Sequence, residues 1–145
     1  MKAGVDFGTS LVKAVWINDG KYKFSSTADT QLEEIARQLS DDGVRRIHPV
    51  GIGYSNAHAD YFRNFELKSP EGDPIENEAR LQAEGTRRLL ENEGYHGNSF
   101  LVVSIGTGTS YTLVTEKGAT KFPIGNSLSG GFINGLGKVL GARDY

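Results

Sequence analysis

A Gly-Thr-Ser turn between two strand-forming stretches occurs twice in the chain, and this repeat limits the possible folds more than any other feature. Residues 5–15 read VDFGTSLVKAV (hairpin 1), and residues 104–114 read SIGTGTSYTLV (hairpin 2). A plain hairpin needs only a two-residue turn such as Asn-Gly. The backbone N–H groups of a glycine-rich turn form a concavity that binds anions. Each hairpin is therefore predicted to bind a phosphate group, although a merely flexible turn is the alternative for either one alone.

The segments that surround the two hairpins repeat one order of elements. Three strands are predicted in each copy, at 2–7, 11–17 and 21–28 and at 99–105, 109–115 and 119–124. A helix follows each meander, the first after the N-cap types Asp29 and Thr30 and the second at 130–141. This weak internal duplication predicts an α/β fold with one complete domain and the first strands and helix of a second.

The segment between the two copies predicts two more strands and two helices. The first strand lies at 46–52, where Pro49 places it near a sheet edge, a short helix follows near 55–62, and the second strand is FELKS, 65–69. A long helix is predicted at 74–93, with proline at its first position. Gly85 in its interior costs about 1 kcal/mol relative to alanine, so we expect it to mark close packing or a nearby ligand.

Composition and charge exclude several classes of protein. The chain has 145 residues, 37% of them hydrophobic, which suffices for a globular core. Its net charge of -2 gives no basic field for nucleic acid or anionic lipid, so a small-molecule or protein partner is expected. The absence of cysteine excludes disulfides and thiolate metal sites. No apolar run approaches the ~18 residues of a membrane span, and we expect a soluble cytoplasmic protein.

Hairpin 1 also carries two charged residues that suit phosphate chemistry. Asp6 ends its first strand and Lys13 lies on its second. A carboxylate beside phosphates suits Mg²⁺, which keeps several of its waters and takes few protein ligands. A turn-capping aspartate and an exposed strand lysine are the alternative interpretation.

These stretches resemble the phosphate-binding hairpins of a known superfamily. DFGTSLVK and SIGTGTS are similar to the first and second hairpins of the actin-like ATPases, which include sugar kinases, actin and the large heat-shock ATPases and have ribonuclease H-like domains. VVSIGTGTSYTLV followed by SLSGGFINGLGKVLG is most similar to type II pantothenate kinases, which transfer the γ-phosphate of ATP to pantothenate in coenzyme A biosynthesis. The resemblance implies a first domain at 1–96, with hairpin 1 and the catalytic helix, and the start of a second at 97–145.

The resemblance assigns roles to individual residues. The residues implied to bind the ATP phosphates are Asp6, Gly8, Thr9, Ser10 and Lys13 in the first loop and Gly106, Thr107, Gly108, Thr109 and Ser110 in the second. Asp6 would hold Mg²⁺ through water. The catalytic acidic residue of the family lies seven positions before a glycine on the long helix, and in EARLQAEG this residue is Glu78. Glu78 would act as general base toward the substrate hydroxyl, or would orient this hydroxyl for attack. Without the resemblance, the position of Glu78 on the helix favours an ordinary solvated glutamate.

The chain departs from the family pattern where the substrate is bound. Phe122 occupies the position of an expected substrate-contacting arginine, with Lys121 beside it, and the glycine triplet is reduced to Ser129-Gly130-Gly131. Lys121, Gly130 and Gly131 are therefore the substrate contacts that the resemblance implies. A lysine supplies a point charge but not the bidentate fork of arginine.

Chain length bears on the expected activity. Members of the superfamily close ATP between two similar domains, and the loop that contacts adenosine lies in the later half of the second. A chain of 145 residues lacks that half, so we expect the N-terminal portion of a kinase that uses ATP and Mg²⁺, acts on pantothenate or a related hydroxyl compound, and forms a homodimer. The alternatives are a non-catalytic sensor or interaction module of the same fold, or another small-molecule kinase or ATPase of the superfamily.

Overall fold

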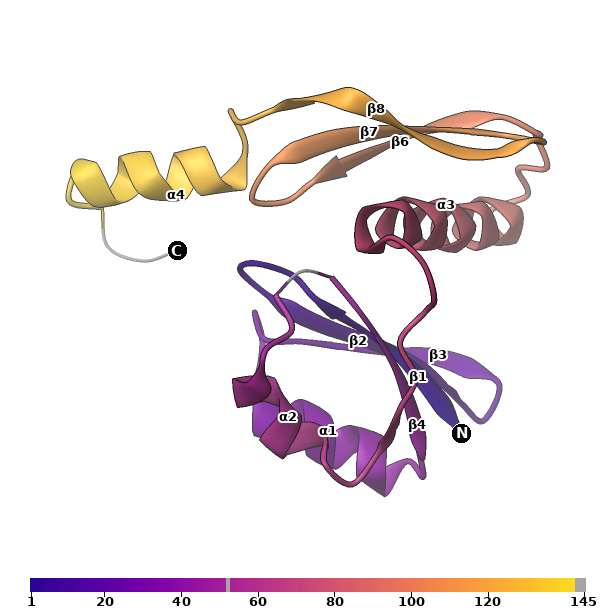
Figure 1. The fold of residues 1–145 in the computed structure, drawn as a ribbon, viewed down its shortest axis with the longest axis vertical. Helices are drawn as coiled ribbons and strands as arrows, with labels where there is room; N and C mark the ends of the chain where they lie inside the picture. The colour runs from indigo at the N-terminus through magenta and orange to yellow at the C-terminus, as the bar shows by residue number, and fades with distance from the viewer. Residues whose placement is uncertain (52, 143–145) are drawn as a thin grey trace. The chain divides into compact units, whose positions relative to one another are not determined.

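The computed structural model describes residues 1–51 and 53–142 (Figure 1). Its elements, in chain order, are β1 (Lys2–Phe7), β2 (Val12–Asn18), β3 (Lys21–Ser26), α1 (Leu32–Asp41), β4 (Arg46–Val50), α2 (Asn56–Phe62), β5 (Glu66–Leu67), α3 (Pro74–Asn92), β6 (Phe100–Ile105), β7 (Thr109–Thr115), β8 (Gly118–Asn126) and α4 (Gly130–Val139). Residue 52, the end of the strand predicted at 46–52, lies outside the described residues, as do residues 143–145 of the predicted second domain.

The chain forms two compact units, Met1–Asn77 and Glu78–Tyr145. The division falls within α3, whose first turn belongs to the first unit. The assignment of homologous domains to residues 1–96 and 97–145 remains a prediction.

The first unit is a mixed five-stranded sheet in the order β3-β2-β1-β4-β5. The antiparallel part of the sheet comes first along the chain and consists of β1, β2 and β3, which short turns connect. A parallel neighbour needs a crossover, and α1 provides it, bringing β4 alongside β1 with Lys2 opposite Arg46 and Asp6 opposite Val50.

Alternation of side chains along β1 and β2 creates the core. Ala3, Val5 and Phe7 are all buried on one face of β1, as the period of two along a strand requires. Ile35 and Leu39 of α1 lie against this face and have no exposed surface. α1 begins one residue later than the predicted caps suggest: Gln31 is its N-cap, and the amides of Asp29 and Thr30 bond Ser26 O in the preceding turn.

The prediction that Pro49 lies near a sheet edge agrees with the strand pairing. Pro49 is opposite Val5 of β1, and β5 pairs only with Arg46 and Ile47 at the start of β4. The side of β4 away from β1 therefore has no ladder at Pro49 among the described residues. A residue without an N–H group is tolerated there.

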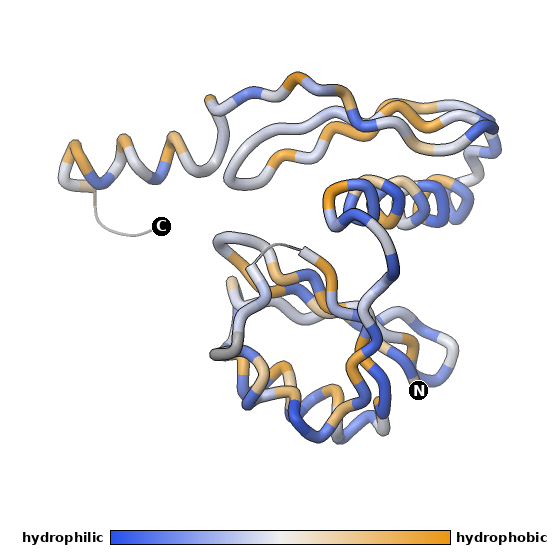
Figure 2. Tube along the Cα trace, viewed as in Figure 1, coloured by the Kyte–Doolittle hydropathy of each residue, from blue (hydrophilic) through white to orange (hydrophobic). Residues whose placement is uncertain are grey.

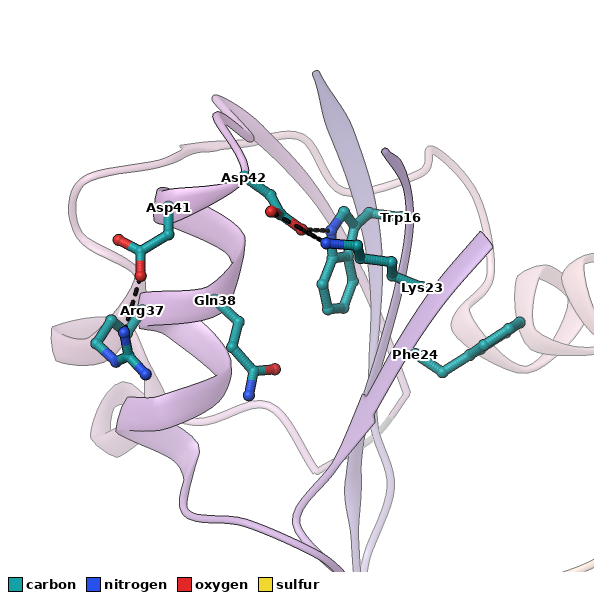
Figure 3. A pocket seen from close by; sticks show the side chains of 7 residues that line it. All are labelled: Trp16, Lys23, Phe24, Arg37, Gln38, Asp41 and Asp42. Atoms are coloured by element: carbon teal, nitrogen blue, oxygen red, sulfur yellow. Dashed lines mark hydrogen bonds and ion pairs between the residues drawn. The ribbon is translucent and has the colours of Figure 1, made fainter. Parts of the chain in front are cut away.

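A polar contact fastens the end of α1 to the sheet. The indole N–H of buried Trp16 donates to Asp42 Oδ2 at 2.6 Å, and Lys23 Nζ lies 2.9 Å from the same oxygen (Figure 3). These donors, Lys23 first and then Trp16, hold the pKa of the Asp42 carboxyl below its ordinary value. Asp42 satisfies the one polar atom of an otherwise apolar buried ring, so this contact stabilises the fold.

The second unit is a three-stranded antiparallel sheet, β6-β7-β8, with α3 alongside it and α4 beyond one end of it (Figure 1). The helix α3 runs along one face, where the guanidinium of Arg87 lies 5.4 Å from the ring centre of Phe100. Figure 2 shows hydrophobic residues recurring along α4, yet none of its residues is buried.

The helix α3 begins as the sequence predicts. Pro74 is its first residue, and Asp73 Oδ1 accepts hydrogen bonds of 2.9 Å from the amides of Ile75 and Glu76. The close packing expected at Gly85 is not found, because no described atom other than its chain neighbours and the local helix backbone lies within 4 Å of a Cβ built at this position. Among the described residues, no helix combines the length and the apolar character needed to cross a membrane.

Candidate active site

Hairpin 1 is a tight turn between β1 and β2. The amide of Gly8 donates to Leu11 O at 3.0 Å, which closes the turn around Thr9 and Ser10. A Cβ at Gly8 would lie 2.9 Å from Leu11 O, so the turn requires glycine here. The start of β2 is fixed by Thr27, whose Oγ1 accepts from the amide of Val12 at 2.9 Å.

The loop after β4 supports hairpin 1 from behind. The amide of Gly53 donates to Phe7 O at 2.7 Å, and a Cβ at Gly53 would lie only 2.4 Å from Gly8 O. Gly51 has a φ of +89°, which favours glycine, and a Cβ there would lie 2.7 Å from Asp6 Oδ1. The two glycines thus allow the loop to approach the backbone and carboxylate of the predicted phosphate site.

Asp6 and Lys13 lie directly opposite each other on β1 and β2. Lys13 Nζ is 3.2 Å from Asp6 Oδ2, and the two side chains are 56% and 41% exposed. An exposed pair of this kind contributes little to stability, but it places a cation and a carboxylate together at the mouth of hairpin 1.

This arrangement fits a hydrated Mg²⁺. Among residues 1–51 and 53–142, no group of three or more His, Asp or Glu side chains gathers as a metal cage. Mg²⁺ with ATP takes one or two carboxylates and fills its other positions with waters and phosphate oxygens. The exposed oxygens of Asp6 suit that role.

Hairpin 2 is held against the start of α4. The amide of Gly106 donates to Gly108 O at 2.9 Å within the turn. The amides of Gly130 and Gly131 donate to Gly106 O and Thr107 O, each at 3.0 Å. The buried hydroxyl of Ser129 donates to Thr107 O at 2.7 Å.

The close approach of α4 to hairpin 2 explains why two glycines stand at the start of this helix. A Cβ at Gly130 would lie 2.8 Å from Gly106 O, and one at Gly131 would lie 2.7 Å from Thr107 O. Their backbone amides are engaged with hairpin 2, so these glycines shape that hairpin. Thr109 and Ser110, the other predicted residues of hairpin 2, form the first two positions of β7. Contact of Gly130 and Gly131 with a substrate remains a prediction.

Glu78 lies in the first half of α3 and has two partners in its own unit. Gln82 Nε2, one turn later, donates to Glu78 Oε1 at 3.0 Å, and Lys121 Nζ of β8 lies 3.8 Å from Glu78 Oε2. The Glu78 side chain is 35% exposed and that of Lys121 is 29% exposed. The structure therefore brings the predicted catalytic carboxylate and the predicted substrate lysine together.

Three supporting residues were not identified as such from the sequence. Gly53 lies in a glycine cluster whose contact partner the sequence does not reveal. Gln82 follows Glu78 at helical spacing, which is the only local signal of their hydrogen bond. Ser129 precedes the paired glycines, but its bond to Thr107 depends on a long-range approach of α4.

Comparison with solved structures identifies the class of fold. The ethanolamine utilization protein EutJ from Carboxydothermus hydrogenoformans superposes with a TM-score of 0.51 at 18% identity, over 98% of this chain and 57% of that chain. The predicted fold class, an α/β actin-like ATPase fold, is thereby confirmed. No protein-family profile matches the chain.

Comparison with curated proteins identifies the relatives. The chain is 31% identical over 146 residues to a type II pantothenate kinase of Staphylococcus saprophyticus, covering 100% of this chain and 52% of that protein. It is 31% identical over 142 residues to one of Oceanobacillus iheyensis, covering 96% of this chain and 48% of that protein. The predicted resemblance to type II pantothenate kinases is confirmed, and the chain spans about half the length of the curated relatives it matches.

Proposed function

We propose that the chain forms the N-terminal, phosphate-binding part of an ATP-dependent kinase that phosphorylates pantothenate in coenzyme A biosynthesis. One observation carries the proposal: the similarity to the Staphylococcus saprophyticus kinase extends over the whole chain. The formation of both hairpins as tight, glycine-supported turns supports it. The activity of the whole kinase belongs to the proposal, since the chain covers half of such a protein.

The proposed reaction is the attack of a hydroxyl oxygen on the γ-phosphorus of ATP. The bond between the γ-phosphorus and the bridging oxygen breaks, ADP leaves, and the hydroxyl proton passes to the carboxylate of Glu78. Bound Mg²⁺ would neutralise phosphate charge. Lys13 and the loop amides stabilise the charge that develops on the transferred group, and catalysis rests mainly on positioning and electrostatics.

The partners of Glu78 are suited to this role. Gln82 fixes one carboxylate oxygen, which leaves Oε2 beside the ammonium group of Lys121. In the proposed complex Lys121 turns toward the carboxylate of the substrate and frees Oε2 for the hydroxyl proton. Such a kinase acts in the cytoplasm, and a homodimer is part of the proposal.

The test is phosphoryl transfer by the gene product that carries this sequence. It is incubated with ATP labelled in the γ-phosphate, Mg²⁺ and pantothenate, and labelled phosphopantothenate is expected. Transfer to a different hydroxyl compound, but not to pantothenate, would support another small-molecule kinase. The presence of Phe122 at the expected arginine position favours that second candidate. Absence of both transfer and ATP hydrolysis would refute the proposal and support a non-catalytic sensor.

A further inference from the structure

His58, in the first turn of α2, is a titratable residue that the proposed reaction does not use. The centre of its ring lies 5.2 Å from that of Phe7 and 6.3 Å from that of Tyr54. Phe7 is buried and ends β1, immediately before Gly8 of hairpin 1. The imidazole of His58 therefore packs directly against the residue that precedes the turn of hairpin 1.

A hydrogen bond also joins His58 to the loop after β4. The amide of Ser55, the N-cap residue of α2, donates to His58 Nδ1 at 3.1 Å, and Ser55 Oγ lies 3.0 Å from the same nitrogen. Because a backbone amide only donates, Nδ1 is the unprotonated nitrogen, and the proton of the neutral ring is on Nε2. The bond from the Ser55 amide thus exists only while the imidazole is neutral.

The same loop holds hairpin 1 two residues before Ser55. The amide of Gly53 donates to Phe7 O at 2.7 Å, and the backbone of Gly53 lies so near Gly8 O that a side chain has no room there. His58 therefore reaches hairpin 1 by two routes. One is the ring contact with Phe7, and the other runs through Ser55 and the loop to Gly53.

In the part of the chain that the structure describes, no ion pair to His58 is found that would compensate a positive charge on its ring. Tyr54 is the titratable group that this ring meets. The charged side chains of β1, Lys2 and Asp6, lie on the face opposite Phe7. The charged residues of α1, which packs against α2, and of α2 itself pair with one another or are exposed: Glu33, Glu34, Arg37, Asp41 and Asp60.

We propose that His58 is a positioning residue for hairpin 1: its neutral imidazole fixes the loop after β4, and its protonation loosens hairpin 1 and lowers the affinity for ATP. The inference rests on the proposed function in naming ATP as the ligand. Histidine changes its charge between about pH 5 and pH 8. A proton on Nδ1 can be donated to the Ser55 hydroxyl, but it opposes the Ser55 amide, so the bond from that amide is lost.

The first test follows the loop without any ligand. The gene product that carries this sequence is isotope-labelled in its glycine amides, and magnetic resonance spectra are recorded from about pH 8 to about pH 5.5. The signals of Gly8 and Gly53 should shift with the same midpoint as the ring protons of His58. The variant His58→Gln should lose this transition, because a glutamine in a capping box accepts from the N-cap amide and does not titrate.

The second test measures the phosphate site by calorimetric titration with ATP and Mg²⁺. Between about pH 8 and about pH 5.5 the affinity of the parent protein should fall about fivefold more than that of His58→Gln, the factor that corresponds to loss of one helix cap. Protonation of ATP itself is common to both proteins and cancels. His58→Ala removes the acceptor and should bind weakly at both pH values, whereas His58→Gln restores the affinity.

His96→Gln is the matched control, because His96 is exposed and lies beyond α3 in the second unit. Its pH profile should equal that of the parent. The proposal would be overturned if the amides of Gly8 and Gly53 did not respond while the ring of His58 titrated. It would also be overturned if the parent and His58→Gln had the same pH profile of ATP affinity.

The two tests separate this proposal from the proposed kinase. Fluorescence of Trp16 verifies that each variant is folded, and the glycine spectra of the parent decide the question even if a variant is not. A protein that binds no ATP at any pH would contradict the proposed function, while the ligand-free spectra would still test the coupling of His58 to hairpin 1.

Discussion

Replacing Gly53 by alanine tests whether the loop after β4 supports hairpin 1. The new Cβ would lie 2.4 Å from Gly8 O and 2.7 Å from Phe7 O, distances that Cβ atoms essentially never show. Relief requires the loop and the hairpin to separate by about 0.6 Å, which also lengthens the bond from the Gly53 amide to Phe7 O. Overpacking of this kind costs about 1–3 kcal/mol.

The expected effect appears in stability and in phosphate binding. A loss of 1 kcal/mol lowers the melting temperature of a small domain by roughly 4 °C or more, so Gly53→Ala should lower it by at least about 4 °C. Displacement of hairpin 1 should also weaken ATP binding about tenfold, because a hydrogen bond to a charged group contributes about 1.5–3 kcal/mol and about 1.4 kcal/mol is a factor of ten in affinity. Circular dichroism and calorimetric titration measure the two quantities.

Gly85→Ala is the control for this substitution. Apart from its chain neighbours and the local helix backbone, no described atom lies within 4 Å of its added Cβ, and alanine in a helix interior is more stable than glycine by about 1 kcal/mol. The melting temperature should therefore rise in this variant. If both alanine variants gave the same melting temperature, the reasoning about the Gly53 contact would be refuted.

Two further predictions concern hairpin 2 and acid stability. Gly131→Ala places a Cβ 2.7 Å from Thr107 O. Loss of one hydrogen bond from hairpin 2 to a phosphate should lower ATP affinity about tenfold in titration calorimetry, and unchanged affinity would contradict the role of α4 in shaping hairpin 2. Because its partners lower the folded-state pKa of Asp42, the carboxylate contributes stability above its ordinary pKa of 3.8, and this contribution is lost as pH falls through the lower folded-state value. Urea titrations followed by Trp16 fluorescence should show a falling midpoint in that range, and Asp42→Asn should flatten the pH dependence; an equal slope in both proteins would contradict this assignment.

The elements of the fold followed closely from local patterns. The alternation of Ala3, Val5 and Phe7 predicts a strand with one buried face, and the spacing of Ile35 and Leu39 predicts a helix that covers it. Both signals arise within a few residues, so the sequence contains them completely.

The contacts of the candidate site depend on long-range approaches that no local pattern records. Lys121 of β8 meets Glu78 because α3 lies along the face of the second sheet, and Ser129 reaches Thr107 because α4 begins against hairpin 2. Gly85 shows the opposite case, since its cost in a helix suggested close packing or a nearby ligand, and the structure shows no packing contact at its Cβ position beyond the local helix. Glycine alone does not distinguish a backbone contact from an exposed position.

The central claim is that Glu78 handles the hydroxyl proton in a kinase reaction. The most direct measurement is the rate of phosphoryl transfer from ATP to pantothenate by the gene product, its Glu78→Gln variant and its Glu91→Gln variant, which changes another glutamate of α3. Loss of a general base lowers the rate by about 10²–10⁴-fold, so Glu78→Gln should fall by at least about 10²-fold while Glu91→Gln retains the parent rate. Equal rates in the two variants would contradict the account.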